Sequence, residues 1–194
     1  MKLSLELTYQ SSKEWIDCVM NDFDSFLQDH ADCERKASAM AMSFIAKCPD
    51  RTDVIPKLIE TGIEELEHFQ DVYNIMEKRG IQLNHEIPQD LYIKQLINAC
   101  RSGRDDRLMD RMLIASIVEC RGAERFKMIA DALEDMELKS FYKRLWTSEA
   151  KHGNLFVNLA LNYWDKETVY KRLNELNEIE GIICSKLPIR PALH

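Results

Sequence analysis

The chain has 194 residues, of which 45% are hydrophobic and 30% charged, a composition typical of a folded helical protein. It contains only six glycines and five prolines, which argues against a β-sandwich or β-barrel, because such folds need many turns, and against a disordered chain. With 26 basic and 33 acidic residues, the net charge of −7 excludes a wholly basic nucleic-acid module, but it is compatible with a local basic patch.

Neither a membrane span nor an export signal is recognisable in the sequence. No window has the long charge-free apolar run that a membrane span requires, and the N-terminal MKLSLELTYQ lacks the apolar core of a signal peptide. The six cysteines are spread out without a C-x-x-C pair. We therefore expect a cytoplasmic protein, outside membranes, whose cysteines are reduced thiols.

Helical periodicity predicts seven helical segments within one domain, residues 1–194. Apolar residues recur at steps of three and four in four long stripes, and turn signals such as Pro49, Gly80 and Gly103 separate the segments. In chain order, the segments begin near Ser11 and Ser12 and end near Asn21, then cover about 23–48, 54–75, 91–100, 108–130, 138–163 and 166–184. We expect an all-α fold, an antiparallel four-helix bundle with additional flanking helices.

Each long stripe carries a glutamate near its middle, where an apolar residue would be expected. An ionised carboxylate away from water is costly unless it is paired or binds a metal. In two stripes a histidine follows three residues later, on the same face of the helix. The residues concerned are Glu34, Glu65, His68, Glu119, Glu149 and His152.

The four glutamates are expected at one level of the bundle. From Glu34 to Glu65 there are 31 positions with Pro49 near the middle, and from Glu119 to Glu149 there are 30, again with a turn midway. Each glutamate is thus about 15 residues, or about 22 Å, from its turn. The two halves repeat at distances of 85 and 84 positions, which indicates an approximate internal duplication.

Four carboxylates and two imidazoles at one level predict a site for two metal ions. Hard oxygen ligands favour iron, with manganese as the alternative, and four negative charges balance two divalent ions. The competing interpretation, a set of buried ion pairs, would need matching cations that these stripes lack. Glu64 lies four residues before His68, but Ser148 occupies the equivalent position in the second half, which favours Glu65.

The sequence around these residues carries more information than their spacing alone. The stretches are DHADCERKASAMAMSFIAK, EELEHFQDVYNIMEKRGIQL, IVECRGAERFKMIA and FYKRLWTSEAKHGNLFVNLA. They resemble the MiaE family of tRNA hydroxylases, and the resemblance extends over about residues 15–180. It implies a ferritin-like di-iron domain, and the six residues selected by spacing match the ligand motif of the family.

The resemblance implies an O₂-dependent di-iron monooxygenase that hydroxylates the isopentenyl side chain of methylthio-isopentenyl-adenosine in tRNA. No catalytic residue is expected beyond the metal ligands. An external electron donor such as a ferredoxin or reductase is expected, since the chain has no flavin or iron–sulfur motif. The alternatives are a di-metal peroxidase or ferroxidase of the rubrerythrin or ferritin type and a non-catalytic helical protein. A monomer or small homo-oligomer is expected.

Four arginines are spaced three, three and four residues apart, namely Arg101, Arg104, Arg107 and Arg111. If all are helical, they form one stripe that could grip tRNA phosphates; the alternative is a solvated face paired with neighbouring aspartates.

Other residues near the predicted ligands leave alternatives open. His30 is expected to be an ordinary core histidine whose hydrogen bonds are satisfied, with a partner of Glu34 or a residue of an access channel as the alternatives. Glu124 does not share the helical face of the predicted ligands and is expected to be a supporting or surface acid. Cys33 and Cys120 are expected to be buried packing thiols. The aromatic residues Tyr142, Trp146 and Tyr163 are expected in core packing rather than in electron transfer or stacking on a base.

Overall fold

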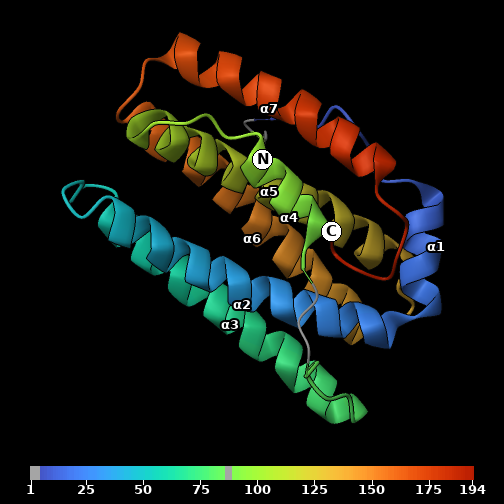
Figure 1. Ribbon diagram of the computed structural model, residues 1–194. Coiled ribbons are helices and arrows are strands. Elements are labelled where there is room, and N and C mark those ends of the chain that lie inside the picture. Colours follow the sequence, from blue (N-terminus) through green and yellow to red (C-terminus); the bar gives the residue numbers. More distant parts are fainter. Residues whose placement is uncertain (1–4, 86–88) are drawn as a thin grey trace. The chain divides into compact units, whose positions relative to one another are not determined.

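The computed structural model describes residues 5–85 and 89–194, and in these ranges it contains seven α-helices and no strand (Figure 1). The helices are α1 (Lys13–Asn21), α2 (Phe23–Lys47), α3 (Ile55–Arg79), α4 (Leu91–Asn98), α5 (Arg104–Ala132), α6 (Met136–Leu161) and α7 (Lys166–Lys186). The predicted all-α class and the order of the segments are therefore confirmed.

Short polar side chains explain where most of these helices begin. An aspartate precedes each of α2, α4, α6 and α7, and its carboxylate accepts a hydrogen bond from a backbone N–H of the first turn. At the other end of α3, Gly80 adopts the left-handed conformation with φ 70°, as the sequence predicts. Gly103 has φ 100° and stands directly before α5, so this helix begins at Arg104.

The contacts of the described residues divide the chain into two compact units. One contains α2 and α3 and residues 190–193, and the other contains α4 to α7, the N-terminal segment and His194, with the boundary inside α1. Each unit therefore holds one of the two halves that the sequence duplication predicts. That the whole chain forms a single domain stays a prediction.

In the first of these units, α2 and α3 lie side by side and antiparallel (Figure 1). Arg79 at the end of α3 donates to Asp24 at the start of α2, and the Ser38 hydroxyl donates to the Gly62 carbonyl at 2.7 Å. A Cβ on Gly62 would lie 3.4 Å from the Ala41 methyl. Small residues thus let the two helices approach closely near their middles.

In the other unit, α5 and α6 form the second long antiparallel pair. The Ser116 hydroxyl donates to the Gly153 carbonyl at 2.7 Å, and farther along the Phe126 and Tyr142 rings lie 5.6 Å apart. A Cβ on Gly153 would lie 2.8 Å from the Cys120 sulfur. Ser116 and Gly153 thus let this pair approach closely as well.

Ion pairs attach α7, and the loop that follows α4, to α5. Asp110 of α5 accepts hydrogen bonds from Arg172 of α7 and from Arg101 in the loop before α5. Deeper in the unit, the Arg121 guanidinium makes two hydrogen bonds to Glu180, at 2.8 and 2.9 Å. These pairs fix the flanking helices that the sequence expects beside the long ones.

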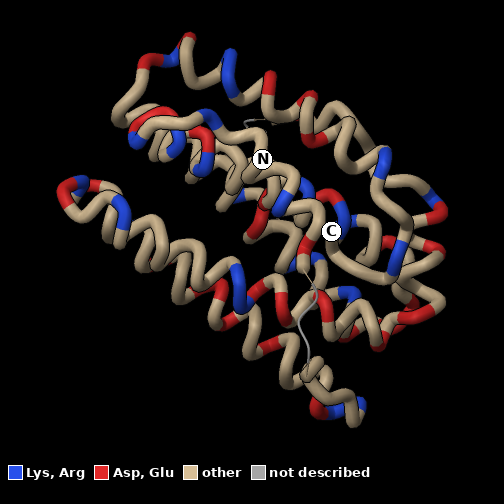
Figure 2. The backbone as a smooth tube through the Cα atoms, in the orientation of Figure 1, with Lys and Arg blue, Asp and Glu red and all other residues tan. Residues whose placement is uncertain are grey.

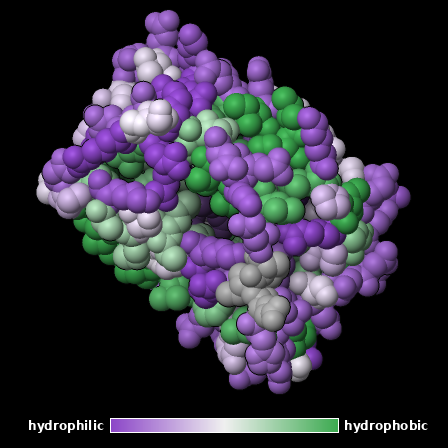
Figure 3. All heavy atoms as spheres, in the orientation of Figure 1, coloured by the Kyte–Doolittle hydropathy of each residue, from purple (hydrophilic) through white to green (hydrophobic). Residues whose placement is uncertain are grey.

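No helix of the described residues is long and apolar enough to cross a membrane. Hydrophilic and hydrophobic residues are mixed on the face seen in Figure 3. Figure 2 shows that acidic residues occur within the lengths of α2 and α3 and not only at their ends. The acidic residues in mid-helix include the predicted metal ligands Glu34 and Glu65.

Candidate metal centre

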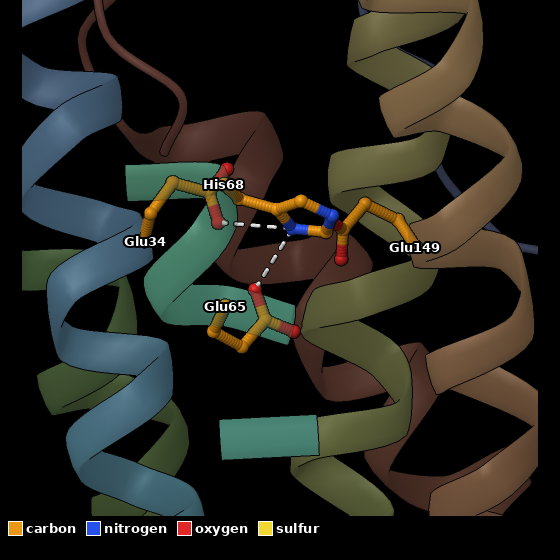
Figure 4. A group of neighbouring side chains, drawn as sticks. All are labelled: Glu34, Glu65, His68 and Glu149. Atoms are coloured by element: carbon orange, nitrogen blue, oxygen red, sulfur yellow. Dashed lines mark hydrogen bonds and ion pairs between the residues drawn. The ribbon is translucent and has the colours of Figure 1, made fainter. Parts of the chain in front are cut away.

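The α2–α3 unit brings together Glu34 of α2 with Glu65 and His68 of α3, here called the α2–α3 triad (Figure 4). His68 Nδ1 lies 3.3 Å from Glu65 Oε2 and 3.8 Å from Glu34 Oε2. One ligand atom from each residue lies within 4.8 Å of the other two. Glu65 is buried and faces His68, whereas the preceding Glu64 is exposed.

His30 supports this triad from the preceding turn of α2. Its Nε2 lies 2.6 Å from Glu34 Oε1, and its side chain is fully buried. His30 is therefore a core histidine, as expected, and its partner is the predicted ligand Glu34. The hydrogen bond holds one carboxylate oxygen of Glu34 and leaves the other on the side of His68.

The other unit carries the matching α5–α6 triad, which consists of Glu119 of α5 with Glu149 and His152 of α6. His152 Nδ1 lies 3.7 Å from Glu149 Oε2, and one ligand atom of each residue lies within 4.8 Å of the other two. Glu149 passes beside Gly122, where a Cβ would lie 3.8 Å from its Cγ. This is an ordinary van der Waals distance, so the α5 backbone at Gly122 lies directly beside the Glu149 side chain.

Each triad has the donor chemistry of a site for a divalent ion. It offers two carboxylates and one imidazole, ligands that suit iron and manganese. Two atoms bound to one ion at about 2.0–2.2 Å are at most about 4.4 Å apart, so atoms gathered within 4.8 Å need only small adjustments to share an ion. The residues present therefore fit a metal.

The four arginines do not form one helical stripe, which the sequence predicted only if all four were helical. Arg104, Arg107 and Arg111 lie on α5, but Arg101 precedes the helix because the chain turns at Gly103. The Arg101 guanidinium contacts Asp110 at 2.7 Å and Asp106 at 3.1 Å. Contact with tRNA phosphates stays a prediction for all four.

The burial of the cysteine and aromatic side chains can be compared with what the sequence predicts. Cys120 is buried, and burial raises the pKa of its thiol to about 11, as expected for a packing residue. Cys33 was expected to be buried but is only half-buried, with its sulfur 3.7 Å from Asp29. Tyr142 lies in the core, whereas Trp146 is half-buried.

Glu124 belongs to neither triad. Its carboxylate accepts hydrogen bonds from the backbone N–H of Ser11 at 2.6 Å, from the Ser11 hydroxyl at 2.8 Å and from Arg121 at 2.9 Å. It thereby fixes the N-terminal segment against α5, beside a cavity that no pattern in the sequence signals. That cavity depends on a contact between residues more than a hundred positions apart.

A solved structure places this architecture among known proteins. "Protein 43 with aldehyde deformylating oxygenase activity" from Synechococcus aligns with a TM-score of 0.91 and 29% sequence identity, covering 97% of this chain and 94% of that chain. The match confirms the ferritin-like, all-α class that the sequence predicts.

The family is more specific. A family model described as tRNA-(MS[2]IO[6]A)-hydroxylase (MiaE) matches residues 3–194, and the chain belongs to this family of tRNA hydroxylases. Two similar proteins are each named tRNA 2-(methylsulfanyl)-N(6)-isopentenyladenosine(37) hydroxylase. The one from Pseudomonas putida is 33% identical over 155 residues, 80% of this chain and 75% of the relative. The one from Salmonella typhimurium is 32% identical over 128 residues, 66% of this chain and 46% of the relative.

Proposed function

We propose that the chain is an O₂-dependent di-iron monooxygenase that hydroxylates the isopentenyl side chain of 2-(methylsulfanyl)-N6-isopentenyladenosine in tRNA. The observation that carries the proposal is the pair of matching Glu–Glu–His triads in a chain of the MiaE family. A nucleic-acid module without chemistry would have no use for six such residues in mid-helix.

We infer that the two triads supply one centre of two metal ions. The ligands are Glu34, Glu65, His68, Glu119, Glu149 and His152. Four carboxylates and two neutral imidazoles carry four negative charges, which two divalent ions neutralise, whereas either triad alone supplies only three ligands. Iron is the expected metal and manganese the alternative, since both take carboxylate and imidazole ligands.

When bound, the iron pair supplies the activation of O₂. The overall reaction uses the substrate, O₂, two electrons and two protons, and it yields the alcohol and one water molecule. The two electrons come from an external reductant such as a ferredoxin with its reductase. The role of the chain is to hold the ions, and His30 contributes by fixing one oxygen of Glu34.

The proposal also covers the cellular location, the oligomeric state and the tRNA contacts of the enzyme. The enzyme is expected to act in the cytoplasm as a monomer or small homo-oligomer. Arg104, Arg107 and Arg111 of α5 are offered as contacts to tRNA phosphates. Arg101 is expected to contribute less, because its charge is shared with Asp106 and Asp110.

The test is hydroxylation by the iron-loaded full chain. It is incubated with tRNA that contains the modified adenosine, a chemical or ferredoxin-based reductant and ¹⁸O₂, and the nucleosides are analysed by mass spectrometry. We expect one ¹⁸O atom in the product and none with Glu119→Ala, whose folding is checked by circular dichroism. No product from wild-type protein, together with rapid turnover of peroxide without tRNA, would support the peroxidase or ferroxidase alternative instead.

A further inference from the structure

A cavity of about 520 Å³ lies between the N-terminal segment, α5 and α6, entirely within one unit. This volume lies within the range of small-molecule sites. Cys120, Ala123 and Ala150 line it with short side chains, and Leu7 and Trp146 contribute larger apolar surfaces. The remaining lining residues are polar, namely Glu6, Gln10, Glu124, Lys127 and Thr147.

The N-terminal side of the cavity is held in place by hydrogen bonds. The Asn177 amide donates to the Glu6 carbonyl at 2.8 Å, and the Thr8 hydroxyl donates to the Asn177 carbonyl at 3.0 Å. Farther along, Ser11 is bound twice by Glu124. The segment is thus attached to α7 at one end and to α5 at the other, so the cavity is formed before any ligand arrives.

The cavity is adjacent to the α5–α6 triad along both helices. Cys120 directly follows Glu119, and Ala150 directly follows Glu149. Ala123 lies one helical turn beyond Glu119, on the same side of α5. Along the helix axes the short side chains therefore lie within about one turn of two predicted metal ligands, although none of those ligands is among the residues that line the cavity.

The chemistry of the lining fits a substituted nucleobase. Trp146 offers an aromatic surface, and single-stranded or flipped-out RNA bases are commonly bound by stacking on such residues. Lys127 Nζ lies 5.9 Å from the centroid of the Trp146 ring, at the exposed edge of the cavity. An ammonium group beside a stacking surface suits a nucleotide, whose base and phosphate are close together.

We propose that this cavity binds the modified adenine base of the substrate tRNA, an inference that rests on the proposed function. The base stacks on Trp146, and its apolar isopentenyl and methylsulfanyl groups lie against Cys120, Ala123 and Ala150. Lys127, which lies 3.4 Å from the exposed Asp131 carboxylate, exchanges that partner for a neighbouring phosphate. A base that is stacked within the tRNA loop must leave its neighbours to reach the cavity.

The experiment measures binding of the free nucleoside 2-(methylsulfanyl)-N6-isopentenyladenosine to the iron-loaded full chain by equilibrium dialysis, alongside KM and kcat for tRNA. The variants are Trp146→Ala, Trp146→Phe and Thr147→Trp, which obstructs the rim from an exposed position. Trp164→Ala is the matched control, because Trp164 is outside the lining. Metal content and circular dichroism verify that each variant is folded and loaded.

We expect Trp146→Ala and Thr147→Trp to raise Kd and KM about tenfold, Trp146→Phe to change them less, and Trp164→Ala to leave them unchanged. Hydroxylation by wild-type protein together with unaltered Kd in both cavity variants would overturn the inference and leave the proposed function intact. Binding of the nucleoside that depends on Trp146, without any hydroxylation, would support the cavity and contradict the proposed function.

Discussion

At the scale of single residues, the predicted metal ligands depend on neighbours that orient them. His30 is buried and 2.6 Å from Glu34, so it restricts the rotation of that carboxylate. Partners of this kind affect metal affinity although they do not touch the ion. The site is therefore larger than its six ligands, and its supporting residues can be tested separately.

We expect His30→Ala to weaken metal binding about 10- to 100-fold, because Glu34 then loses its hydrogen bond. Titration with Fe(II) under anaerobic conditions, or with Co(II) followed by absorption, measures the affinity. His30→Gln is the control, since an amide can restore a hydrogen bond to the carboxylate. Equal affinity in the wild type and His30→Ala would show that the contact has no role in the site.

The buried Arg121–Glu180 ion pair is expected to contribute to the stability of the fold. Both side chains are fully buried, and Tyr92 adds a hydrogen bond to Glu180 at 3.0 Å. Replacing Arg121 by methionine leaves the Glu180 carboxylate buried without its cation, so we expect a loss of about 3–5 kcal/mol in the free energy of unfolding. Urea denaturation measures it.

The double variant Arg121→Met with Glu180→Leu is the control for that prediction, because it removes both charges from the interior. It should recover much of the lost stability. A single variant as stable as the wild type would contradict the expected cost of burying the Glu180 carboxylate without Arg121.

Residue-level predictions from the sequence succeeded where helical phase decides. Glu65 rather than Glu64 faces His68, as the comparison of the two halves indicated. The sequence left the role of His30 open, because a spacing of four residues places it on the right face without fixing the hydrogen bond. For the four arginines, the sequence predicted one stripe only if all of them were helical, and Arg101 lies outside α5 because the chain turns at Gly103.

At the scale of helices, close packing depends on glycine to different degrees in the two long pairs. A Cβ on Gly153 would meet the buried Cys120 sulfur at 2.8 Å and the Ser116 carbonyl at 3.3 Å. A Cβ on Gly62 would meet chiefly the Met42 methyl at 2.6 Å, the end of a flexible and partly exposed side chain. Only the first contact forces the helices apart.

We therefore expect Gly153→Ala to destabilise the protein by about 1–3 kcal/mol, measured by thermal or urea unfolding of the metal-free chain. Gly62→Ala serves as the matched variant and should cost less, because the methionine can move and alanine favours the helix. Similar losses in both variants would contradict this account of the packing.

Asp110 connects three elements and makes stability depend on pH. Burial acts to raise the pKa of this carboxyl, but hydrogen bonds from Arg172 and Arg101 outweigh burial, and the pKa is lowered overall. A lowered pKa stabilises the fold above the unfolded pKa of about 3.9, and this contribution disappears as the pH falls through the lower folded value.

We expect Asp110→Asn to cost about 2 kcal/mol at neutral pH, because two charge-assisted interactions are weakened. The difference in unfolding free energy between the wild type and this variant should shrink as the pH falls below about 4. Urea unfolding at several pH values measures it. A difference that stays constant down to pH 2 would show that Asp110 does not titrate with folding.

Helix positions were predictable because local signals agree with one another. Aspartates that accept hydrogen bonds from the first turn, Gly80 at the end of α3 and three–four periodicity all specify the same boundaries. The cavity beside α5 was not predictable. It exists because the N-terminal segment returns to α5 and α7, and such a long-range contact leaves no periodic pattern.

At the scale of the whole molecule, the duplication seen in the sequence coincides with the division into two units. Each unit contains one antiparallel pair of long helices with its own Glu–Glu–His triad. Each pair joins two helices that follow one another in the chain, so the sequence could predict both pairs from their periodicity and the turn between them. A metal centre with ligands from both triads would add a link between the units that neither pair provides alone.

The last prediction tests that link through stability. Ions that bind only the folded chain stabilise it by mass action, by about 2.7 kcal/mol when the free metal is at 100 times its Kd. We expect anaerobic Fe(II) or Mn(II) to raise the melting temperature of the wild type and two ions to bind per chain. A variant without the α2–α3 triad, Glu34→Ala with Glu65→Ala and His68→Ala, should lose the stabilisation, and so should the corresponding variant of the α5–α6 triad. If either variant still bound two ions with the wild-type increase in melting temperature, a single centre of six ligands would be wrong, because the remaining triad would then account for both ions by itself.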